Sequence, residues 1–446
     1  MPSLQRFKIN GLYGERDINI PFFDNIKILV AENGYGKTTV LNTLYALASG
    51  NISRLRKLSF ESIEVFFDDK TKYIVEKKML VVSSKLMEKN PFYDHLKRVL
   101  GVEDSLTLVE SFLTSGVTEF RRSNLFLFAR KKSEIPASTF LEYLSEIRNS
   151  IHNGQDFAKA RAILKQIQDK LGFNVLYLPT YRRVEQDFRE IRGGMEENDG
   201  RADNIYDDFI NFGMIDVDRR IQELTSEILS SSVEWFSKVN GEMLGQLVEG
   251  FQVDDSLKRS IQDPEAIKIV LDRIGVNISS QQKKQILRLI ETKEIFKDHD
   301  PLIYFLSNLV KVYEQQKDND KAIQAFVEVC NRYLGDKKLV YNESLVSVKI
   351  VRRKNNRDVD IENLSSGEKQ IISLFCSLYL KKEENFAIFF DEPELSLSME
   401  WQKTLLPDVV NSGRCAFLFA TTHSPFIFEN QLSRYTVDLS HYIRER

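Results

Sequence analysis

The sequence predicts an α/β fold, in which a mixed sheet flanked by helices is interrupted by two helical insertions. Near the N-terminus, over residues 26–48, a short apolar run leads into a glycine-containing loop and then into an apolar pattern with helical spacing. Residues 367–420 alternate between helix and strand patterns, and the interval between the two blocks reads mostly as helix. A chain of 446 residues with 42% apolar content is long enough to bury a sizeable core across such a division.

The individual elements follow from local patterns. Alternating apolar residues indicate strands, a spacing of three to four indicates helices, and glycine, asparagine and aspartate clusters indicate the turns between them. In chain order we expect strands at 4–9, 18–20 and 26–30, a helix at 37–48, a hairpin from 62–67 and 73–78, helices within 83–171, a strand at 174–178, helices within 187–336 around a polar loop at 193–200, a strand at 345–351, a helix at 367–380, a strand at 386–390, a helix at 399–410 and a strand at 416–420.

Composition and charge indicate the cellular compartment and the kinds of partner to expect. With 62 basic and 65 acidic residues the formal net charge is -3, so no global field draws the chain onto nucleic acid or an anionic membrane. The N-terminus lacks the apolar core of a secretory signal, and no apolar run approaches the ~20 residues of a membrane helix. Cys330, Cys376 and Cys415 lie in apolar surroundings without metal-site spacing, so we expect buried thiols in a cytoplasmic protein that does not contact a membrane.

A glycine loop follows the strand expected at 26–30. From Ala31 to Thr38 the chain reads Ala-Glu-Asn-Gly-Tyr-Gly-Lys-Thr, which matches the phosphate-binding pattern G-x-x-x-x-G-K-[ST] except at its first position. Gly34 and Gly36 allow backbone amides to turn toward a phosphate, and the following helix N-terminus favours negative charge. Lys37 is then placed for the β- and γ-phosphates and Thr38 for Mg²⁺. The alternative, a glycine turn that happens to precede a lysine, fits the flanking strand and helix less well.

A pair of carboxylates follows a second buried strand. Residues 386–390 form a short apolar run that is typical of a fully buried parallel strand. Asp391 and Glu392 come next, at the carboxyl end where α/β sheets bind ligands. We expect Asp391 to hold the Mg²⁺ shell and Glu392 to orient and deprotonate an attacking water. Taken alone, the pair could also be an acidic strand end that enters the turn at Pro393.

Two further segments complete a set of four. Residues 364–368, Leu-Ser-Ser-Gly-Glu, open the helix expected at 367–380, with Ser365 and Ser366 as potential N-caps. The strand at 416–420 ends in Thr-Thr-His-Ser-Pro, which brings His423 near the position of a γ-phosphate. A lone histidine at a strand end is more often structural, but the order of the four segments favours a shared site.

These residues resemble those of the ATPase heads of ABC-type proteins, over residues 1–80, 172–190 and 340–430. The resemblance implies ATP and Mg²⁺ as cofactors and ATP hydrolysis as the activity. It implies Glu392, Lys37 and His423 as catalytic residues, Asn33, Gly34, Tyr35, Gly36, Lys37, Thr38 and Thr39 as ATP-binding residues, Ser365, Ser366, Gly367 and Glu368 as the signature segment, and Thr38 and Asp391 as metal ligands.

The same resemblance implies an assembly. ABC-type heads form a head-to-head dimer around two ATP molecules, in which the signature segment of one copy acts on the nucleotide of the other. The long interval between the phosphate loop and the signature looks like the SMC, RecF and OLD branch of these proteins and unlike transporters. In such a dimer, ATP binding closes the two heads and ATP hydrolysis lets them separate. Hydrolysis therefore sets the timing of a conformational cycle.

One segment departs from the family pattern. Residues 174–179 resemble the strand that leads into the glutamine loop of ABC-type heads, but Thr180 occupies the glutamine position and Arg182 and Arg183 follow closely. Either arginine could contact phosphate or a partner. A solvated basic turn is the equally acceptable alternative.

Within its branch the chain is similar to the compact ATPase subunits of two-component anti-phage systems such as PARIS, Septu and retron-associated pairs. The segments that carry this similarity are residues 178–183 and 212–217. The resemblance implies a homo-oligomeric sensor or scaffold that responds to a phage trigger protein. It would restrain or release a separate toxic effector, a nuclease encoded nearby.

A DNA-maintenance ATPase that clamps duplex DNA is the alternative function. Lys258 with Arg259, Lys283 with Lys284, and the basic run 352–354 are candidate DNA-phosphate contacts, although such pairs are usually solvated faces. A transporter motor fits less well, because the helical insertions exceed what a coupling domain requires.

The expected domain organisation follows from these assignments. It consists of the N-terminal half of the head at 1–80, a helical insertion at 81–171, a return strand and loop at 172–190, a second helical insertion for oligomer or partner contacts at 191–339, and the C-terminal half of the head at 340–446.

Overall fold

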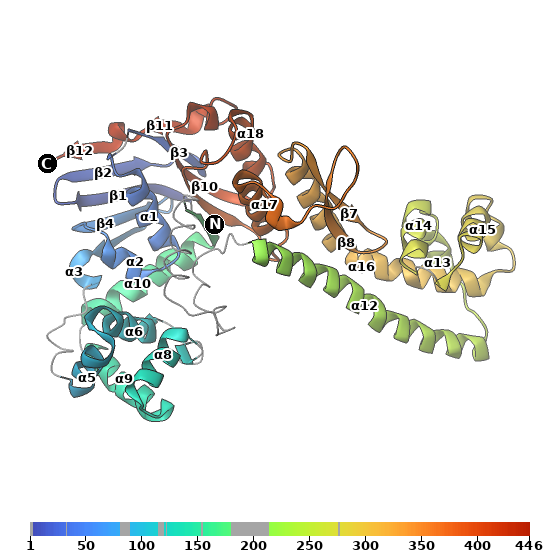
Figure 1. Ribbon diagram of the computed structural model, residues 1–446, viewed down its shortest axis with the longest axis horizontal. Helices are drawn as coiled ribbons and strands as arrows, with labels where there is room; N and C mark the ends of the chain where they lie inside the picture. Colours follow the sequence, from blue (N-terminus) through green and yellow to red (C-terminus); the bar gives the residue numbers. More distant parts are fainter. Residues whose placement is uncertain are drawn as a thin grey trace. The chain divides into compact units, whose positions relative to one another are not determined.

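The computed structural model describes residues 3–32, 34–80, 90–114, 120–121, 123–152, 155–179, 214–274 and 277–446 (Figure 1). The chain divides into two compact units. Residues 1–211 and 383–446 form the first, and residues 212–382 form the second. The polar loop expected at 193–200 lies outside the described residues.

A parallel sheet forms the centre of the first unit. Its strand order is β11-β3-β10-β9-β6, and each neighbouring pair is parallel. Every residue of β9 is buried, as expected for an apolar strand covered on both faces. The strands are β3 (Ile26–Val30), β6 (Asn174–Leu178), β9 (Phe386–Asp391), β10 (Cys415–Thr422) and β11 (Thr436–Asp438). The four expected strands of this sheet are confirmed, and β11 is an addition to them.

A second, antiparallel sheet shares the core of this unit. Its order is β12-β2-β1-β4-β5, with β1 (Leu4–Leu12), β2 (Arg16–Pro21), β4 (Ser62–Phe67), β5 (Lys72–Glu76) and β12 (Ile443–Glu445). Helix α1 (Lys37–Ala48) packs against β10, β9 and β6, and its apolar residues join one buried cluster with those of β1 and β4. The expected hairpin is present, but its second strand ends at Glu76 and gives way to helix α3 (Lys77–Leu80).

The remaining regular elements in the described part of the first unit are helices. They are α2 (Ile52–Lys57), α5 (Pro91–Leu100), α6 (Val102–Thr114), α8 (Asn124–Ser133), α9 (Ala137–His152), α10 (Gln155–Leu171) and α18 (Met399–Val410), with the 3₁₀ turns η5 (Pro425–Ile427), η6 (Ser433–Tyr435) and η7 (Leu439–Tyr442). Figure 1 shows α5, α6, α8 and α9 gathered in one cluster. Edge-to-face contacts join the rings of Phe92 and Phe140, of Phe126 and Phe140, and of Phe112 and Phe120, so aromatic packing holds this cluster.

The second unit is built on two long helices, α12 (Met214–Glu249) and α16 (Asp300–Asn331). Three short helices and a 3₁₀ turn share an apolar core with α16, and we call them the three-helix cluster: α13 (Asp255–Ser260), α14 (Pro264–Arg273), α15 (Ser280–Glu291) and η3 (Glu294–Phe296). Of these, α13, α14 and η3 pack on α16, and α15 packs on α14 and η3. The unit also contains the hairpin β7 (Lys337–Asn342) and β8 (Ser347–Arg352), the turn η4 (Ile361–Asn363) and helix α17 (Ser366–Tyr379). The sequence indicated β8 but not its partner β7.

A buried polar network ties three of these elements together. Arg273 of α14 donates to both carboxylate oxygens of Asp320 on α16, at 2.8 and 2.7 Å, and to Gln316 at 2.8 Å. Tyr341 of β7 also donates to Asp320, which is only 2% exposed. A buried carboxylate needs such partners, so the network fixes the β7–β8 hairpin against α14 and α16.

The cysteine environment agrees with expectation. Cys330 and Cys376 are buried and Cys415 is half-buried. Burial raises the pKa of the Cys376 and Cys415 thiols to about 12, so both are protonated at neutral pH. Among the described residues, no helix combines the length and the apolar character that crossing a lipid bilayer requires.

Candidate functional site

Three strand ends meet at one edge of the parallel sheet. Strand β10 lies between β3 and β9 and runs parallel to both, so the carboxyl ends of all three point the same way. The glycine loop follows β3, Asp391 ends β9, and His423 follows β10. Ligands of α/β sheets bind at this edge, and the topology therefore gathers residues that lie hundreds of positions apart in sequence.

The glycines of the loop are required by backbone conformation. Gly34 and Gly36 have φ values of 89° and 86°, in the left-handed region that favours glycine. Space is not the constraint, because an added Cβ would meet nothing within 4 Å at Gly34 and only Leu12 at 3.7 Å at Gly36. Ala31 has no such positive φ, which explains why an alanine is accepted where the pattern has a glycine. Asn33 lies outside the described residues.

Lys37 extends into the loop from the start of α1. It is 6% exposed, and its Nζ donates to the carbonyl oxygens of Ala31 at 2.6 Å and Glu32 at 3.2 Å. Nε2 of His423 lies 2.7 Å from the same Nζ. Burial lowers the pKa of Lys37, and the nearby carboxylates of Glu392 and Asp391 act in the opposite direction. The ammonium is thus held at the centre of the strand-end edge.

Thr38 and Asp391 form an oxygen-rich pair. Thr38 Oγ1 donates to Asp391 Oδ1 at 3.1 Å, and Thr421 Oγ1 donates to the same oxygen at 2.7 Å. The Asp391 carboxylate is 2% exposed, so these hydroxyls orient it. Hydroxyl and carboxylate oxygens suit Mg²⁺, which takes few protein ligands and completes its shell with water and phosphate. No group of three or more histidine, cysteine or acidic side chains that could hold a metal occurs in the part of the chain that the structure describes.

Glu392 adopts an unusual backbone conformation. Its φ of 51° lies in the left-handed region, which costs a non-glycine residue about 1–2 kcal/mol. The amide of Glu392 donates to the carbonyl oxygen of Thr421 at 2.9 Å, which fixes the turn. Its Oε1 lies 3.6 Å from Nε2 of His423. Strain of this kind is found where the surrounding structure holds a functional side chain in place.

Glu394 anchors the turn that carries His423, a role the sequence did not indicate. Its Oε1 accepts from the amides of His423 at 2.7 Å and Ser424 at 3.2 Å, and its Oε2 accepts from Thr422 Oγ1 at 2.8 Å. The Asp-Glu-Pro-Glu run was the visible signal, but the partners lie about 28 positions further along the chain. Three charge-assisted bonds to one carboxylate set the position of the His423 backbone.

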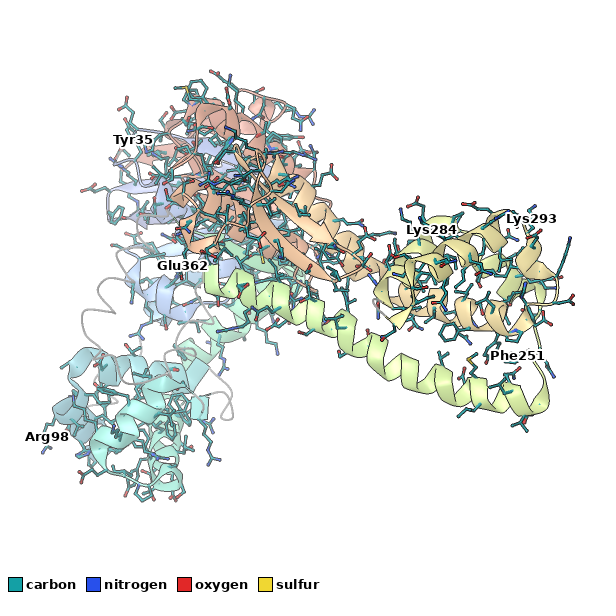
Figure 2. The ribbon with its side chains drawn as sticks, turned by 45° about the vertical axis from the view of Figure 1, so that its right-hand side comes forward. Tyr35, Arg98, Phe251, Lys284, Lys293 and Glu362 are labelled. Atoms are coloured by element: carbon teal, nitrogen blue, oxygen red, sulfur yellow. The ribbon has the colours of Figure 1, made fainter. Side chains whose placement is uncertain are left out.

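Two tyrosines lie beside the loop. Tyr13 is 54% exposed, and its hydroxyl lies 2.8 Å from Oγ1 of Thr39. Tyr35 is 37% exposed, and Figure 2 shows it at the surface of the first unit. Tyr13 lies in the turn at residues 13–15 that joins β1 to β2.

The signature segment belongs to the second unit and begins α17. Ser365 is the N-cap, and Glu368 closes a capping box with it: Glu368 Oε2 accepts from the Ser365 amide at 2.8 Å and from its hydroxyl at 2.9 Å. Lys337 of β7 donates to Glu368 Oε1 at 3.0 Å. Gly367 and Glu368 are buried while Ser365 and Ser366 are exposed, so Glu368 shapes the helix start and the serines face outward.

The structure therefore brings together, within the first unit, the described residues of the glycine loop with Asp391, Glu392 and His423. The signature residues lie in the second unit, which has its own core. Thr180, Arg182 and Arg183 lie outside the described residues.

One protein family matches part of the chain. Residues 252–429 match the sequence model of a family described as "AAA domain, putative AbiEii toxin, Type IV TA system". That interval contains the signature segment, the Asp391–Glu392 strand end and His423. No curated protein sequence matches the chain.

Similar solved structures include heads of Smc proteins. One is an Smc head domain with an extended coiled coil bound to the C-terminal domain of ScpA, from Pyrococcus furiosus, at 12% identity and a TM-score of 0.37, covering 96% of this chain and 91% of that one. Another is an Smc head with a coiled coil and joint from Pyrococcus yayanosii, at 12% identity and a TM-score of 0.30, covering 96% and 93%. The protein therefore has a mixed α/β fold, in which helices flank the sheets of the first unit and a glycine loop joins β3 to α1.

Proposed function

We propose that the protein is an ATP-hydrolysing switch. The observation that carries this proposal is the convergence of Lys37, Asp391, Glu392 and His423 at one edge of the parallel sheet. In this proposal the glycine loop and Lys37 bind the phosphates of ATP, while Thr38 and Asp391 hold Mg²⁺. The ion, when bound, would neutralise charge on the β- and γ-phosphates.

Proton transfer falls to Glu392. A carboxylate at a strand end, half-buried and held by its own strained turn, is suited to accept the proton of the attacking water. His423 lies between Glu392 and Lys37, within 3.6 Å of the first and 2.7 Å of the second. It can therefore donate to the γ-phosphate side of the site while Glu394 holds its backbone.

Dimerisation forms the second part of the proposal. Ser365 and Ser366 are exposed at the N-terminus of a helix of 14 residues, where backbone amides and the helix dipole favour an anion. We infer that this end meets the nucleotide held by a second copy, so that ATP closes a head-to-head dimer and hydrolysis opens it. The exposed serines and the buried, bonded Glu368 support a docking role for this helix end.

The enzymatic proposal is tested by phosphate release from ATP. Purified protein should hydrolyse ATP with Mg²⁺ and stop when EDTA is added, and Lys37→Ala should lose nucleotide binding because the loop loses its only lysine. If the Lys37→Ala protein bound ATP normally, the glycine loop would not be part of the ATP site.

We further propose that the switch serves as the sensor or scaffold of a cytoplasmic anti-phage complex, in which it restrains a separate toxic effector. The description of the matched family, which names a toxin of a toxin–antitoxin system, supports a link to such pairs. The test is to co-express the chain with the products of its flanking genes and weigh the purified assembly by native mass spectrometry. A nuclease or other toxin in fixed ratio is the expected result; recovery of the chain alone would contradict the scaffold role.

A DNA clamp is the second candidate, and the contacts of three of its proposed basic residues weigh against it. Arg352 pairs with Asp336 at 2.6 Å, Arg353 donates to the Asn331 carbonyl oxygen at 2.8 Å, and Lys283 pairs with Asp272 at 3.0 Å. Groups engaged in this way are less available to DNA phosphates. Turnover that rises on addition of duplex DNA and falls with salt would favour the clamp.

A further inference from the structure

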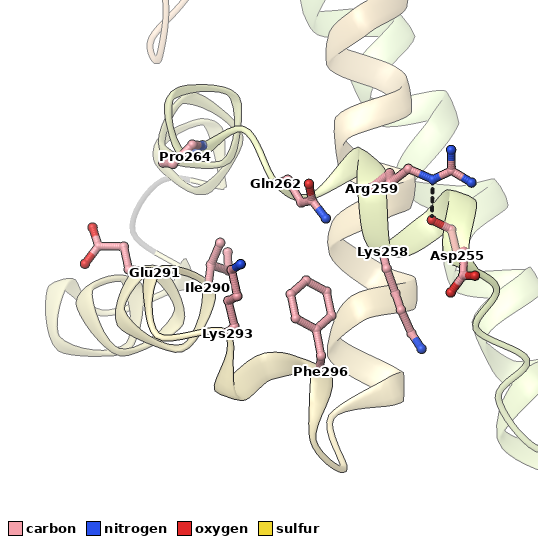
Figure 3. Close-up of a pocket in the computed structure, with 9 residues that line it drawn as sticks. All are labelled: Asp255, Lys258, Arg259, Gln262, Pro264, Ile290, Glu291, Lys293 and Phe296. Carbon is pink, nitrogen blue, oxygen red and sulfur yellow. Dashed lines mark hydrogen bonds between the residues drawn. The ribbon is translucent and has the colours of Figure 1, made fainter.

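A pocket of about 690 Å³ lies in the three-helix cluster of the second unit, and none of its lining residues is among those assigned to the ATP site. Its walls come from α13, α14, α15 and η3, and its lining residues are Asp255, Lys258, Arg259, Gln262, Pro264, Ile290, Glu291, Lys293 and Phe296 (Figure 3). Pockets of roughly 300–1,000 Å³ are the usual size for small-molecule ligands.

The floor of the pocket is part of the core of the cluster. Ile290 is 6% exposed and belongs to the buried apolar cluster, and Phe296 is half-buried and packs against it. Lys293 and Asp298, on either side of Phe296, both have left-handed backbones, with φ values of 57° and 63°. Two such residues in one short segment are costly, and the packing of Phe296 against the apolar cluster helps to hold the segment in this conformation.

Cationic and amide groups surround the ring. Figure 3 shows Phe296 between the side chains of Lys293 and Lys258, with Gln262 above it and the carboxylate of Glu291 directed away. Within the described ranges, neither lysine has a carboxylate within ion-pair distance. Arg259 is held by the carbonyl oxygen of Asp255 at 3.2 Å. The pocket thus combines an aromatic ring with two lysines that have no ion pair among the described residues, and this combination suits an anion attached to a planar group.

We propose that this pocket binds a nucleoside phosphate, with the base stacked on Phe296 and the phosphate between Lys258 and Lys293. Aromatic rings bind bases by stacking, and lysines bind phosphate as point charges. The carboxylates of Asp255 and Glu291 at the rim favour a ligand with one localised anionic group over an extended polyanion. The same chemistry is offered by a free mononucleotide and by the phosphorylated end of a nucleic-acid strand. This site is independent of the ATP site and does not rest on its proposed function.

Calorimetric titration with AMP, GMP, CMP and UMP tests the proposal on the full chain. Nucleoside monophosphates lack the β-phosphate that the glycine loop cradles, and Lys37→Ala in the background removes the remaining contribution of the loop. The Lys258→Ala/Lys293→Ala double variant should lose measurable binding. Phe296→Leu, which keeps an apolar group against the core, should weaken binding about 5- to 150-fold, the value of one stacked base.

Lys284→Ala is the matched control. Lys284 is an exposed lysine of α15 in the same cluster (Figure 2), it does not line the pocket, and its replacement should leave binding unchanged. Equal unfolding temperatures of the variants confirm that the cluster is intact.

Two further probes distinguish a free mononucleotide from the phosphorylated end of a nucleic-acid strand. Binding of a 5′-phosphorylated short oligonucleotide in place of monophosphates assigns the site to strand ends, provided the unphosphorylated oligonucleotide does not bind. Absence of binding for every probe overturns the proposal, as does binding that persists in the double variant. Inorganic phosphate that competes as well as AMP contradicts the stacking of a base on Phe296.

Discussion

The Nζ atom of Lys37 lies 2.7 Å from Nε2 of His423, although the two residues are 386 positions apart in the chain. The same histidine nitrogen lies 3.6 Å from Oε1 of Glu392. One imidazole therefore contacts both the phosphate-loop lysine and the carboxylate that we assign as the base. The strand order β3-β10-β9 produces this contact, because it places β10 between the two.

Glu392→Gln should retain ATP binding and lose turnover. The amide keeps the shape of the side chain and leaves Lys37 and the loop untouched, but it cannot accept a proton. Phosphate release should fall by about 10²- to 10⁴-fold, the usual contribution of a general base, while the ATP affinity changes little. Turnover at the wild-type rate would mean that another group takes the proton.

Glu394→Ala should disturb catalysis without touching nucleotide directly. The variant removes the acceptor that binds the amides of His423 and Ser424, so the turn that carries the imidazole loosens. Hydrogen bonds to a charged group contribute about 1.5–3 kcal/mol each, and we expect a lower unfolding temperature together with a lower kcat. Glu429→Ala, at an exposed glutamate of the same region, is the control and should change neither. If kcat were unchanged in Glu394→Ala, the anchoring of this turn by Glu394 would not be needed for catalysis, contrary to the prediction.

Lys337→Met should weaken the signature helix end. Lys337 Nζ lies 3.0 Å from Oε1 of Glu368, whose other oxygen caps Ser365. Without the lysine, the buried carboxylate loses its cationic partner and the capping box is less well held. We expect ATP binding to persist and ATP-dependent dimerisation, measured by light scattering, to weaken. Lys349→Met removes an exposed pair with Asp358, which contributes little, and should behave as wild type. Equal dimerisation of the two variants would contradict the role of Lys337.

The same ion pair predicts a pH dependence. Burial, the largest single influence, lowers the pKa of Lys337, but its bonds to Glu368 and Asp336 outweigh burial and raise the pKa above 10.5. A group whose pKa is higher in the folded state stabilises the fold below its unfolded pKa and ceases to do so as pH rises through the folded value. The gap in unfolding temperature between wild type and Lys337→Met should therefore be constant up to about pH 9.5 and shrink above pH 10.5. A gap that stays constant throughout would contradict this ion pair.

The parts of the site that could be predicted are those with a local pattern. The loop from Gly34 to Thr38 carries its own spacing, and the strand of Asp391 is a continuous apolar run followed by carboxylates. Each of these signals lies within a dozen residues, so the sequence alone was enough to place Lys37 at the start of a helix after the loop and Asp391 at the end of a strand. The acceptance of Ala31 also followed from local backbone geometry.

The parts that escaped prediction depend on distant pairing. Strand β7 directly follows the long helix α16, and its identity comes from its ladder with β8. Lys337 lies on this ladder and bonds to Glu368, which is 31 positions further along the chain, so its role in holding the capping box had no local signal. Glu394 and Tyr13 likewise make contacts with residues that only the folded sheets bring near. The two residues of each pair lie at least 26 positions apart, so a local sequence pattern does not reveal the contact.

The most direct test of the account is to mix two inactive proteins, Lys37→Ala and Ser365→Arg, and measure ATP hydrolysis. If the signature of one copy completes the site of the other, a mixed dimer contains one site with both an intact loop and an intact signature. An equal mixture should then recover roughly a quarter of wild-type turnover, since half of the dimers are mixed and each has one working site of two. A mixture as inactive as its two components would contradict the head-to-head switch, because it would show that Ser365 acts only within its own chain or not at all.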